Sequence, residues 1–312
     1  MEVNINLDVV VVSYNRLEKL KTALSHYDAQ TAPFRNLILV NNCSTDGTTE
    51  FIGEWERIPS NYNKIIINTS ENIGGSGGFY LGQKKAIELG ADWVFIADDD
   101  AYPDANLFSQ FYTFNSNHCD CSFSAICAEV LTIDGEISLA HRTKCKMDKG
   151  LHFIQYDSPI EDYSKEFFNI DFLSYVGPFI SVAAMRKIGL VNPDYFIFYD
   201  DTEHSFRLRK YGKIICVPQM KVIHDNNVLN LPKVAVSWRD YYLIRNKRHM
   251  LLKHMPIALK LKMTLSFIFK IYRSIPNKQA FDKVYYRAIK DATLGRLGKH
   301  PIYKPGWSIP IQ

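Results

Sequence analysis

The sequence lacks the features of a secreted or disulfide-stabilised protein. Its N-terminus has no positively charged stretch followed by an apolar one, so no secretory signal is predicted. The six cysteines show no even spacing and include no Cys-x-x-Cys pair, which argues against a disulfide framework. We therefore expect reduced thiols in a cytoplasmic protein.

A zinc site is the alternative role for some of these cysteines. His118, Cys119, Cys121 and Cys127 lie close together in the sequence, but ordinary buried thiols are the simpler interpretation. The net charge of +4 is modest, and we expect no nucleic-acid partner. With 312 residues, 46% of them hydrophobic, the chain can bury a substantial core in one large domain or two smaller ones.

The most informative segment is a run of three aspartates, Asp98 to Asp100, which ends the apolar run at residues 93–97. Adjacent carboxylates raise each other's pKa, so a buried strand that ends in three of them needs a cation. Mg²⁺ or Mn²⁺ suits such oxygen ligands and keeps positions open for the phosphates of a sugar nucleotide. For the triplet alone, a solvated acidic loop or a helix N-cap at Asp100 or Asp104 is the alternative.

The first hundred residues alternate between strand and helix patterns. This alternation predicts an α/β fold whose open, mostly parallel sheet is flanked by helices on both faces. The expected strands are residues 8–13, 36–40, 64–68 and 93–97, and the expected helices are residues 16–29, 48–55 and 78–89. In such sheets the ligand binds outside the carboxyl ends of the strands.

Polar motifs follow each of the first three expected strands, at residues 13–15, 41–47 and 70–79. The third motif has four glycines between positions 74 and 78, which would let the backbone approach a phosphate or a sugar ring. It is neither a Walker A motif nor the dinucleotide-binding fingerprint, because no Gly-Lys-Ser/Thr follows and the motif does not come after the first strand. Asn72 is either a ligand contact or a turn former whose side chain bonds its own backbone.

The order of these motifs resembles the inverting family-two glycosyltransferases of GT-A fold, which is Rossmann-like. The resemblance covers roughly residues 5–250 and rests on residues 9–16, 40–48, the glycine-rich loop and residues 98–103. The glycine pattern with the triple aspartate looks most like the branch containing galactofuranosyltransferases and rhamnosyltransferases. Asn41-Asn42 is a departure, because many relatives have an aspartate there that faces the nucleobase.

The resemblance implies metal ligands and a nucleotide-sugar site. Asp98 and Asp100 would coordinate the Mn²⁺ or Mg²⁺ that bridges the donor diphosphate, and Asp99 would support the site or touch the nucleotide. His224, expected after a short strand at residues 213–217 and a turn at Pro218, would be a further ligand; the alternative is a structural histidine. The implied nucleotide-sugar residues are Ser13, Tyr14, Asn15, Asn42, Asp46, Asn72, Gly74, Gly75, Gly78 and Asp99.

A second acidic motif, Asp200-Asp201, resembles the acidic pair that opens a helix near the acceptor in this family. An inverting transfer needs one carboxylate to accept the proton of the acceptor hydroxyl. Asp200 is the first candidate for this catalytic base and Asp201 the second. The alternative is that both residues cap a helix that begins at Thr202.

The composition changes near residue 232, which suggests a catalytic domain at residues 1–232 and a helical region at residues 233–312. Residues 241–246 resemble the Tyr-Tyr-x-x-Arg-Asn element that often follows the catalytic domain in this branch. Residues 256–276 are mainly apolar, but a membrane-spanning helix needs about 20 predominantly apolar residues, and four cations interrupt this one: Lys260, Lys262, Lys270 and Arg273. The segment is either a basic amphipathic helix on the inner face of the cytoplasmic membrane, or a helix packed on the catalytic domain.

These expectations combine into a metal-dependent inverting glycosyltransferase. The favoured reaction moves galactofuranose from its UDP donor to a hydroxyl of a cell-surface glycan or lipid-linked acceptor, and rhamnose from dTDP-rhamnose is the second choice. A sugar-nucleotide-binding protein without activity, or a nucleotidyltransferase, is the alternative from another class. Neither of those requires a base on the acceptor side, so Asp200 and Asp201 distinguish the hypotheses.

Overall fold

The computed structural model describes residues 5–119, 121–226, 235–273 and 280–310. The strands are β1 Leu7–Ser13, β2 Asn36–Asn41, β3 Asn63–Asn68, β4 Trp93–Asp98, β5 Ala101–Pro103, β6 Phe123–Thr132, β7 Arg142–Met147, β8 Phe153–Asp157, β9 Phe168–Ile170, β10 Phe172–Leu173, β11 Pro178–Ser181, β12 Lys213–His224, β13 Ala235–Ser237 and β14 Ser308–Pro310. The helices are α1 Leu17–Asp28, α2 Thr48–Trp55, α3 Gly74–Glu88, α4 Leu107–Asn117, α5 Val182–Ile188, α6 Asp200–Leu208, α7 Trp238–His254, α8 Ile257–Arg273 and α9 Ala280–Thr293.

The central sheet has the order β3-β2-β1-β4-β11-β6-β12-β5, with β9 paired to β12. Strands β1, β2, β3, β4, β6 and β12 run in one direction, and β5, β9 and β11 run in the other. The expected mostly parallel sheet is therefore confirmed. Its carboxyl edge carries the ends of β1, β2 and β4, where the polar motifs begin.

Helices cover both faces of this sheet, because alternate residues of its buried strands point to opposite sides. Val9 and Val11 of β1 pack with α1, α2 and α4, whereas Val10 and Val12 pack with α3, α5 and α6. The continuous β-branched sequence of β1 is thus explained by burial on both faces, as its sequence predicts.

Three expected boundaries differ from the structure. Helix α3 begins at Gly74 rather than Gly78, so the glycine-rich segment forms its first turn. Helix α6 begins at Asp200 rather than Thr202. Strand β12 does not end before Pro218 but continues to His224, with a shift in its pairing with β6 between Val217 and Lys221. Proline is tolerated at such an irregularity, because the ladder is already interrupted there.

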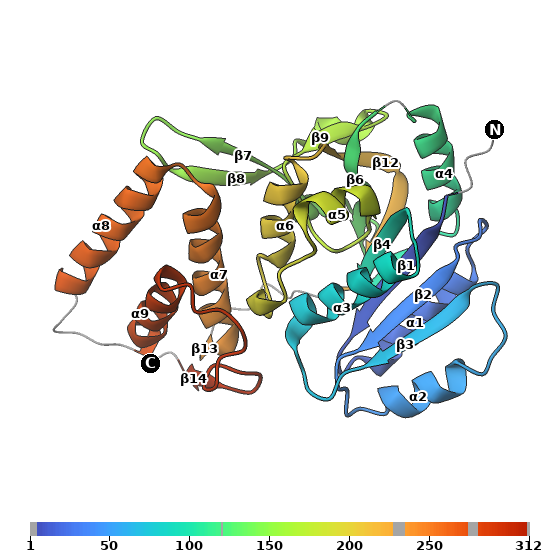
Figure 1. Ribbon diagram of the computed structural model, residues 1–312, viewed down its shortest axis with the longest axis horizontal. Helices are drawn as coiled ribbons and strands as arrows, with labels where there is room; N and C mark the ends of the chain where they lie inside the picture. The colour runs from blue at the N-terminus through green and yellow to red at the C-terminus, as the bar shows by residue number, and fades with distance from the viewer. Residues whose placement is uncertain (1–4, 120, 227–234, 274–279, 311–312) are drawn as a thin grey trace.

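The C-terminal region packs beside the α/β part, and the hairpin formed by β7 and β8 reaches toward α8 (Figure 1). Helix α7 packs against α9, and β13 pairs with β14 near the end of the chain. The expected helical region is confirmed, while the proposed boundary at residues 232 and 233 lies outside the described residues. Among the helices that the structure describes, none is both long and apolar enough to cross a membrane.

Candidate active site

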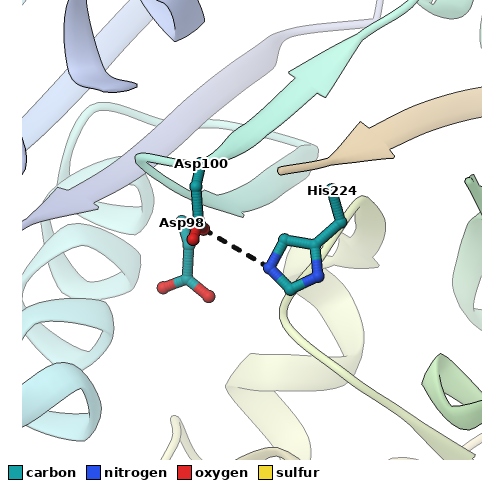
Figure 2. A group of neighbouring side chains, drawn as sticks. All are labelled: Asp98, Asp100 and His224. Atoms are coloured by element: carbon teal, nitrogen blue, oxygen red, sulfur yellow. Dashed lines mark ion pairs between the residues drawn. The ribbon is translucent and has the colours of Figure 1, made fainter. Parts of the chain in front are cut away.

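A cluster of two aspartates and one histidine lies where β4 and β12 end. Strand β4 ends at Asp98, and β5 then pairs with β12 so that Ala101 lies opposite His224. This pairing places His224 beside Asp98 and Asp100, and the backbone N–H of Asp225 donates to the Asp100 carbonyl at 2.8 Å. One side-chain ligand atom from each of the three residues lies within 4.8 Å of the others (Figure 2).

The two aspartates of this cluster differ in their electrostatics. Burial, together with the charges of Asp100 and Asp99, raises the pKa of Asp98 well above its usual value. Burial also acts to raise the pKa of Asp100, but His224 and Arg16 outweigh it and lower that pKa. Arg16 Nη1 lies 2.5 Å from Asp100 Oδ2 and 3.2 Å from Asp99 Oδ1. One arginine therefore offsets only part of the negative charge of the triplet.

The cluster fits a divalent cation. Asp100 Oδ1 is buried, accepts no hydrogen bond, and lies 3.4 Å from His224 Nε2. An orphaned buried carboxylate oxygen is costly, and two carboxylates with one imidazole form a donor set that suits Mn²⁺ or Mg²⁺. The alternative of a helix N-cap is wrong, because α4 begins at Leu107 with Asn106 in the cap position.

No cysteine takes part in a potential metal cluster within the described part of the chain. Cys119 and Cys121 are exposed, whereas Cys127 is buried in β6. The alternative of a zinc site at these cysteines therefore finds no support.

A chain of polar side chains orients His224 toward Asp100. His224 Nδ1 lies 3.2 Å from His141 Nε2, and His141 Nδ1 lies 2.8 Å from Ser174 Oγ. Burial lowers the pKa of His141 to about 3, so its ring is neutral at ordinary pH. If His141 holds its proton on Nδ1, its Nε2 accepts from His224 Nδ1–H, and this leaves His224 Nε2 as the free ligand atom.

Asp99 is tied to the end of β1 rather than to the cluster. It accepts hydrogen bonds from the Ser13 hydroxyl at 2.7 Å and from the Tyr14 N–H at 3.3 Å. Burial raises the pKa of Asp99 to about 6, although Arg16 and Ser13 act to lower it. Asp99 thus joins the first polar motif to the aspartate triplet, and the Tyr14 side chain is left partly exposed.

The residues after β1 and β2 hold each other in place. Asn15 Oδ1 accepts from the Thr45 N–H at 2.7 Å, and Asp46 Oδ2 accepts from the Leu17 N–H at 3.0 Å. Burial alone would raise the pKa of Asp46, but hydrogen bonds from Thr48 and Leu17 lower it. Asp46 therefore satisfies the first N–H groups of both α1 and α2.

Asn42 and Asn72 organise the segment before α3. Asn42 Oδ1 accepts from the Ile73 N–H at 2.9 Å, and its Nδ2 donates to Asn72 Oδ1 at 3.2 Å. Asn72 Oδ1 also accepts from the Gly74 N–H at 2.8 Å, which is the turn expected as one of its two roles. Lys299 Nζ reaches this segment and donates to the Asn72 carbonyl at 2.9 Å.

The glycines at the start of α3 are needed for close packing. Gly74 has φ +78°, and a Cβ there would lie 2.0 Å from the Phe196 carbonyl oxygen. A Cβ on Gly78 would lie 2.6 Å from Val12 Cγ1, so Gly78 lets α3 approach β1. Gly75 is more open, since its nearest neighbour, Phe79 Cε2, is 3.9 Å away. If a nucleotide sugar contacts the backbone at this end of the helix, Gly75 is therefore the most accessible of these glycines.

Asp200 and Asp201 lie in the first turn of α6, and each has a raised pKa. Burial raises the pKa of Asp200, while the Ser76 hydroxyl acts to lower it. Burial and the charge of Asp200 raise the pKa of Asp201 to about 7. The charge of Asp200 also contributes to the raised pKa of Asp98 in the cluster.

The segment before Asp200 has an unusual backbone. Phe196, Phe198 and Tyr199 have φ of +66°, +68° and +62°, although none is glycine. Each such residue costs on the order of 1–3 kcal/mol unless its surroundings hold it in place. Helix α6 begins directly after this segment, with the two aspartates as its first residues.

Two buried residues of α7 hold this segment. Asn246 Nδ2 lies 2.9, 2.7 and 2.9 Å from the carbonyl oxygens of Tyr195, Ile197 and Phe198. Arg245 donates to the Tyr195 carbonyl at 3.1 Å, and its Nε donates to Asn246 Oδ1 at 2.8 Å, which fixes the amide. These bonds are comparable in free energy to the backbone strain, so the Arg-Asn element of α7 stabilises the turn that presents Asp200.

Several residues that complete the site carry little signal in the sequence. Arg16 belongs to the first motif, but the motif alone gives it no role, and neither His141 nor Ser174 stands out in any spacing pattern. The Arg-Asn pair of α7 belongs to a recognisable element, but its contact with residues 195–198 depends on tertiary packing. Only the position of Arg16, at the end of the first motif, offers a signal for a charge near the aspartates.

Comparisons with known proteins agree with this geometry. The family model described as "Glycosyl transferase family 2" matches residues 8–177. The chain is 33% identical over 132 residues to the galactofuranosyltransferase GlfT1 of Mycolicibacterium smegmatis, which covers 42% of this chain and 41% of that protein. It is 28% identical over 207 residues to GlfT1 of Mycobacterium tuberculosis, covering 65% of this chain and 64% of that protein. The chain thus spans less than two thirds of either relative.

A further relative, the dTDP-rhamnosyl transferase RfbF of Shigella flexneri, is 23% identical over 312 residues, covering 95% of this chain and 98% of that protein. Among solved structures, GalNAc-T7 with UDP, GalNAc and Mn²⁺ has a TM-score of 0.65 at 13% identity and covers 94% of this chain and 57% of its own. S. aureus TarS with UDP has a TM-score of 0.57 at 13% identity, covering 93% and 92%. These likenesses establish the GT-A fold. Since the family model spans more than half of its length, the chain belongs to glycosyl transferase family 2 and is a glycosyltransferase.

Proposed function

We propose that this glycosyltransferase carries out a metal-dependent, inverting transfer of galactofuranose from UDP-galactofuranose to a hydroxyl of a cell-surface glycan or lipid-linked acceptor. The observation that carries the proposal is that one chain provides both a metal-ligand cluster, in which Asp98, Asp100 and His224 have ligand atoms within 4.8 Å of one another, and an acidic pair, Asp200–Asp201, in the first turn of α6. The metal-ligand cluster suits the diphosphate of a sugar donor, and the acidic pair suits the proton of an acceptor hydroxyl. Relatives named galactofuranosyltransferase favour this sugar.

The proposed reaction uses one carboxylate of the pair as a base. Asp200 accepts the proton of the acceptor hydroxyl while the hydroxyl oxygen forms a bond to the anomeric carbon. The bond from that carbon to the donor diphosphate breaks on the opposite face, and the anomeric configuration is inverted. Mn²⁺ or Mg²⁺ held by Asp98, Asp100 and His224 would neutralise the charge that develops on the diphosphate. A carboxylate with a pKa raised toward neutrality is a stronger base than an exposed one.

The donor residues proposed are those at the carboxyl edge of the sheet. Tyr14 is exposed, and Gly75 has no neighbour that a Cβ would clash with. By contrast, the side chains of five others already bond within the protein and would shape the site through the backbone: Ser13, Asn15, Asn42, Asp46 and Asn72. Rhamnose from dTDP-rhamnose is the second candidate, and the match to RfbF over nearly the whole chain favours it.

A binding protein without transferase activity has no use for a buried acidic pair. Keeping two carboxylates together in a buried site raises the pKa of both, which costs folding free energy. A base on the acceptor side is one function that would justify this cost. The pair therefore favours an enzyme over a binding module.

We also propose that residues 1–232 form the catalytic domain and that residues 233–312 hold it against the inner face of the cytoplasmic membrane. The second region has 17 Lys and Arg residues and three aspartates, so anionic lipid would attract it. Four exposed apolar residues of α8, spaced so that they share one face of the helix, would enter the interface: Ile257, Leu261, Leu265 and Ile268.

The membrane proposal is tested with two sets of variants, one that removes positive charge and one that removes apolar side chains. Neutralising Lys260, Lys262, Lys270 and Arg273 should reduce co-sedimentation with anionic vesicles, and high salt should have the same effect. Replacing Leu261 and Leu265 by glutamine should weaken binding even at low salt. If the wild-type protein ignores vesicles of either charge, the proposal is wrong.

The donor proposal is tested with a panel of nucleotide sugars. UDP-galactofuranose, dTDP-rhamnose and UDP-glucose are incubated with the protein and Mn²⁺, and release of the nucleotide is measured with and without EDTA. We expect UDP release from UDP-galactofuranose that stops in EDTA and returns when Mn²⁺ is added in excess. Turnover that persists undiminished in EDTA would rule out the metal-dependent reaction. Selective release of dTDP from dTDP-rhamnose would make rhamnose, rather than galactofuranose, the favoured donor sugar.

A further inference from the structure

The C-terminal region forms a cavity of about 430 Å³, partly open to solvent, beside the β7–β8 hairpin. It is bounded by the tip of the hairpin, α7, α8 and α9, which Figure 1 shows together on one side of the molecule. Most of its lining is apolar, including Leu251, Leu259, Met263 and Phe267. The cavity is distinct from the aspartate cluster, since none of its lining residues belongs to the site described above.

A buried arginine faces this apolar cavity without an anionic partner. Arg248 lines the cavity and is only 6% exposed, yet its Nη2 is buried and makes no hydrogen bond. Its Nε donates to Thr293 Oγ1 at 3.0 Å, and its guanidinium lies 5.3 Å from the Phe267 ring. No carboxylate in the described part of the chain forms an ion pair with it. Leaving a buried charge unpaired is unfavourable, so an anion at this position would stabilise the protein.

Two further cations lie at the same cavity. Lys247 and Lys262 belong to its lining, and both are exposed. Lys262 Nζ donates to the Gly150 carbonyl at 2.5 Å and lies 2.8 Å from His152 Nε2, so it ties α8 to the hairpin tip. The cavity therefore combines an apolar interior with three cationic side chains.

We infer that this cavity binds one molecule of a single-chain lipid phosphate, with the chain inside and the phosphate at Arg248 and Lys247. A methylene group occupies about the volume of a water molecule, about 30 Å³, so the cavity holds on the order of 15 carbons of such a chain, and the rest of a longer chain would extend through its open side. This volume suits one chain better than the two acyl chains of an ordinary phospholipid. That such a lipid carries the acceptor rests on the proposed function, but its binding does not depend on donor, metal or base.

Binding is measured with radiolabelled geranylgeranyl phosphate and the full-length protein, without detergent. We expect saturable binding that geranylgeraniol and inorganic phosphate compete for poorly, because each carries only half of the recognised chemistry. Arg248→Gln should weaken binding at least about tenfold, the scale of a lost charge-assisted hydrogen bond. Lys247→Gln, at an exposed position that does not threaten folding, should weaken it by a smaller factor.

Two variants control for the site. Ser266→Trp, which fills the cavity from an exposed position, should abolish binding. Lys260→Gln removes one positive charge from α8 at a position outside the cavity lining, and should change binding less than twofold. Release of UDP from the sugar donor in the absence of acceptor should be unchanged in all four variants, which separates this inference from the transferase proposal.

Three outcomes would overturn the inference. Equal affinity for geranylgeraniol would make the cavity a general apolar pocket. Equal displacement by dioleoylphosphatidylglycerol would assign it to bilayer phospholipid. Wild-type protein that fails to bind geranylgeranyl phosphate while retaining its native melting transition would show that the cavity takes no lipid phosphate.

Discussion

The metal cluster and the acidic pair are held in place by different parts of the molecule. Asp98 and His224 end strands of the central sheet, whose buried residues and backbone pairing fix their positions. Asp200 follows a segment with three left-handed residues, and Asn246 of the C-terminal region bonds the carbonyls of that segment. The sheet thus positions the proposed donor side, and α7 positions the proposed acceptor side.

If the proposed function is right, this difference makes the C-terminal region part of the catalytic apparatus, because α7 holds the segment before Asp200 without touching a substrate itself. Lys253 and His254 of α7 both lie 2.9 Å from Glu203 in α6, and together with Arg207 they lower the pKa of Glu203 against the effect of its burial. Changes in α7 should therefore affect transfer, while changes at the sheet edge should affect donor binding. Substitutions on each side can therefore separate effects on transfer from effects on donor binding. The substitution with the largest expected effect comes first.

Asp100→Ala should have the largest effect, because it removes a ligand and leaves Arg16 without its closest partner. We expect transfer to fall by about 10³-fold or more, since a bound metal contributes several kcal/mol of charge stabilisation. Binding of UDP should lose its dependence on Mn²⁺ in isothermal titration calorimetry. The exposed Asp104→Ala, nearby in sequence, is the control and should behave as wild type. If Asp100→Ala still bound UDP in a Mn²⁺-dependent way, the proposal that Asp100 is a metal ligand would be wrong.

Asn246→Ala should lower the rate of transfer without weakening the donor side. It leaves three backbone carbonyls without their amide donor, so the turn before Asp200 should loosen, with a loss of about 1–3 kcal/mol in the free energy of unfolding. We expect kcat to fall about tenfold or more, while Mn²⁺-dependent UDP affinity stays within twofold of wild type. Arg239→Ala, exposed on the same helix, is the control. Equal losses in kcat and UDP affinity would mean that α7 supports the whole fold rather than the acceptor side.

His141→Ala should produce the opposite pattern. Without its Nε2 acceptor, His224 Nδ1 loses the bond that orients the ring, and outer partners of metal ligands typically contribute about 10- to 100-fold in affinity. We expect Mn²⁺ affinity to fall about tenfold and the maximal rate at saturating Mn²⁺ to change little. His141→Gln, which keeps an acceptor, should recover part of the affinity. An unchanged Mn²⁺ titration in His141→Ala would show that this chain of side chains has no role in metal binding.

The smallest predicted effect is a shift in the pH dependence of transfer. The base must be ionised, and burial raises the pKa of Asp200, so the acid-side decrease of kcat/KM should lie at higher pH than for an exposed aspartate. Asp201→Asn removes one negative charge beside Asp200 and should lower the pKa of that carboxyl, which moves the acid limb to lower pH. If Asp201→Asn instead abolishes transfer at every pH, the two roles are exchanged within the pair.

Most of the sheet and the aspartates of the metal cluster could be predicted from the sequence. Buried parallel strands leave continuous apolar runs, and three adjacent aspartates after such a run indicate a bound cation, because their mutual repulsion must be offset. His224 was expected beside them only through a family resemblance, because the sequence does not reveal that β5 pairs with β12. The length of β12 was underestimated, since Pro218 marks a turn in most sequences but here occupies an irregular position in the strand.

The acceptor side was less predictable for a physical reason. Helix α6 begins two residues earlier than expected because the turn before it adopts left-handed conformations, which bulky residues such as Phe196 and Tyr199 rarely take. That conformation depends on donors from α7, some 50 residues away in the chain, and no local pattern encodes such a contact.

The central claim is that Asp200 acts on the acceptor in the transition state, while the metal cluster binds the donor. The most direct test measures transfer and UDP-sugar affinity in Asp200→Asn, which keeps the size of the side chain. We predict that transfer falls by about 10²-fold or more, the usual scale for a general base, while donor affinity and the melting temperature stay close to wild type. Transfer at near-normal rates in both Asp200→Asn and Asp201→Asn would contradict the account, because the pair would then serve only to stabilise the start of α6.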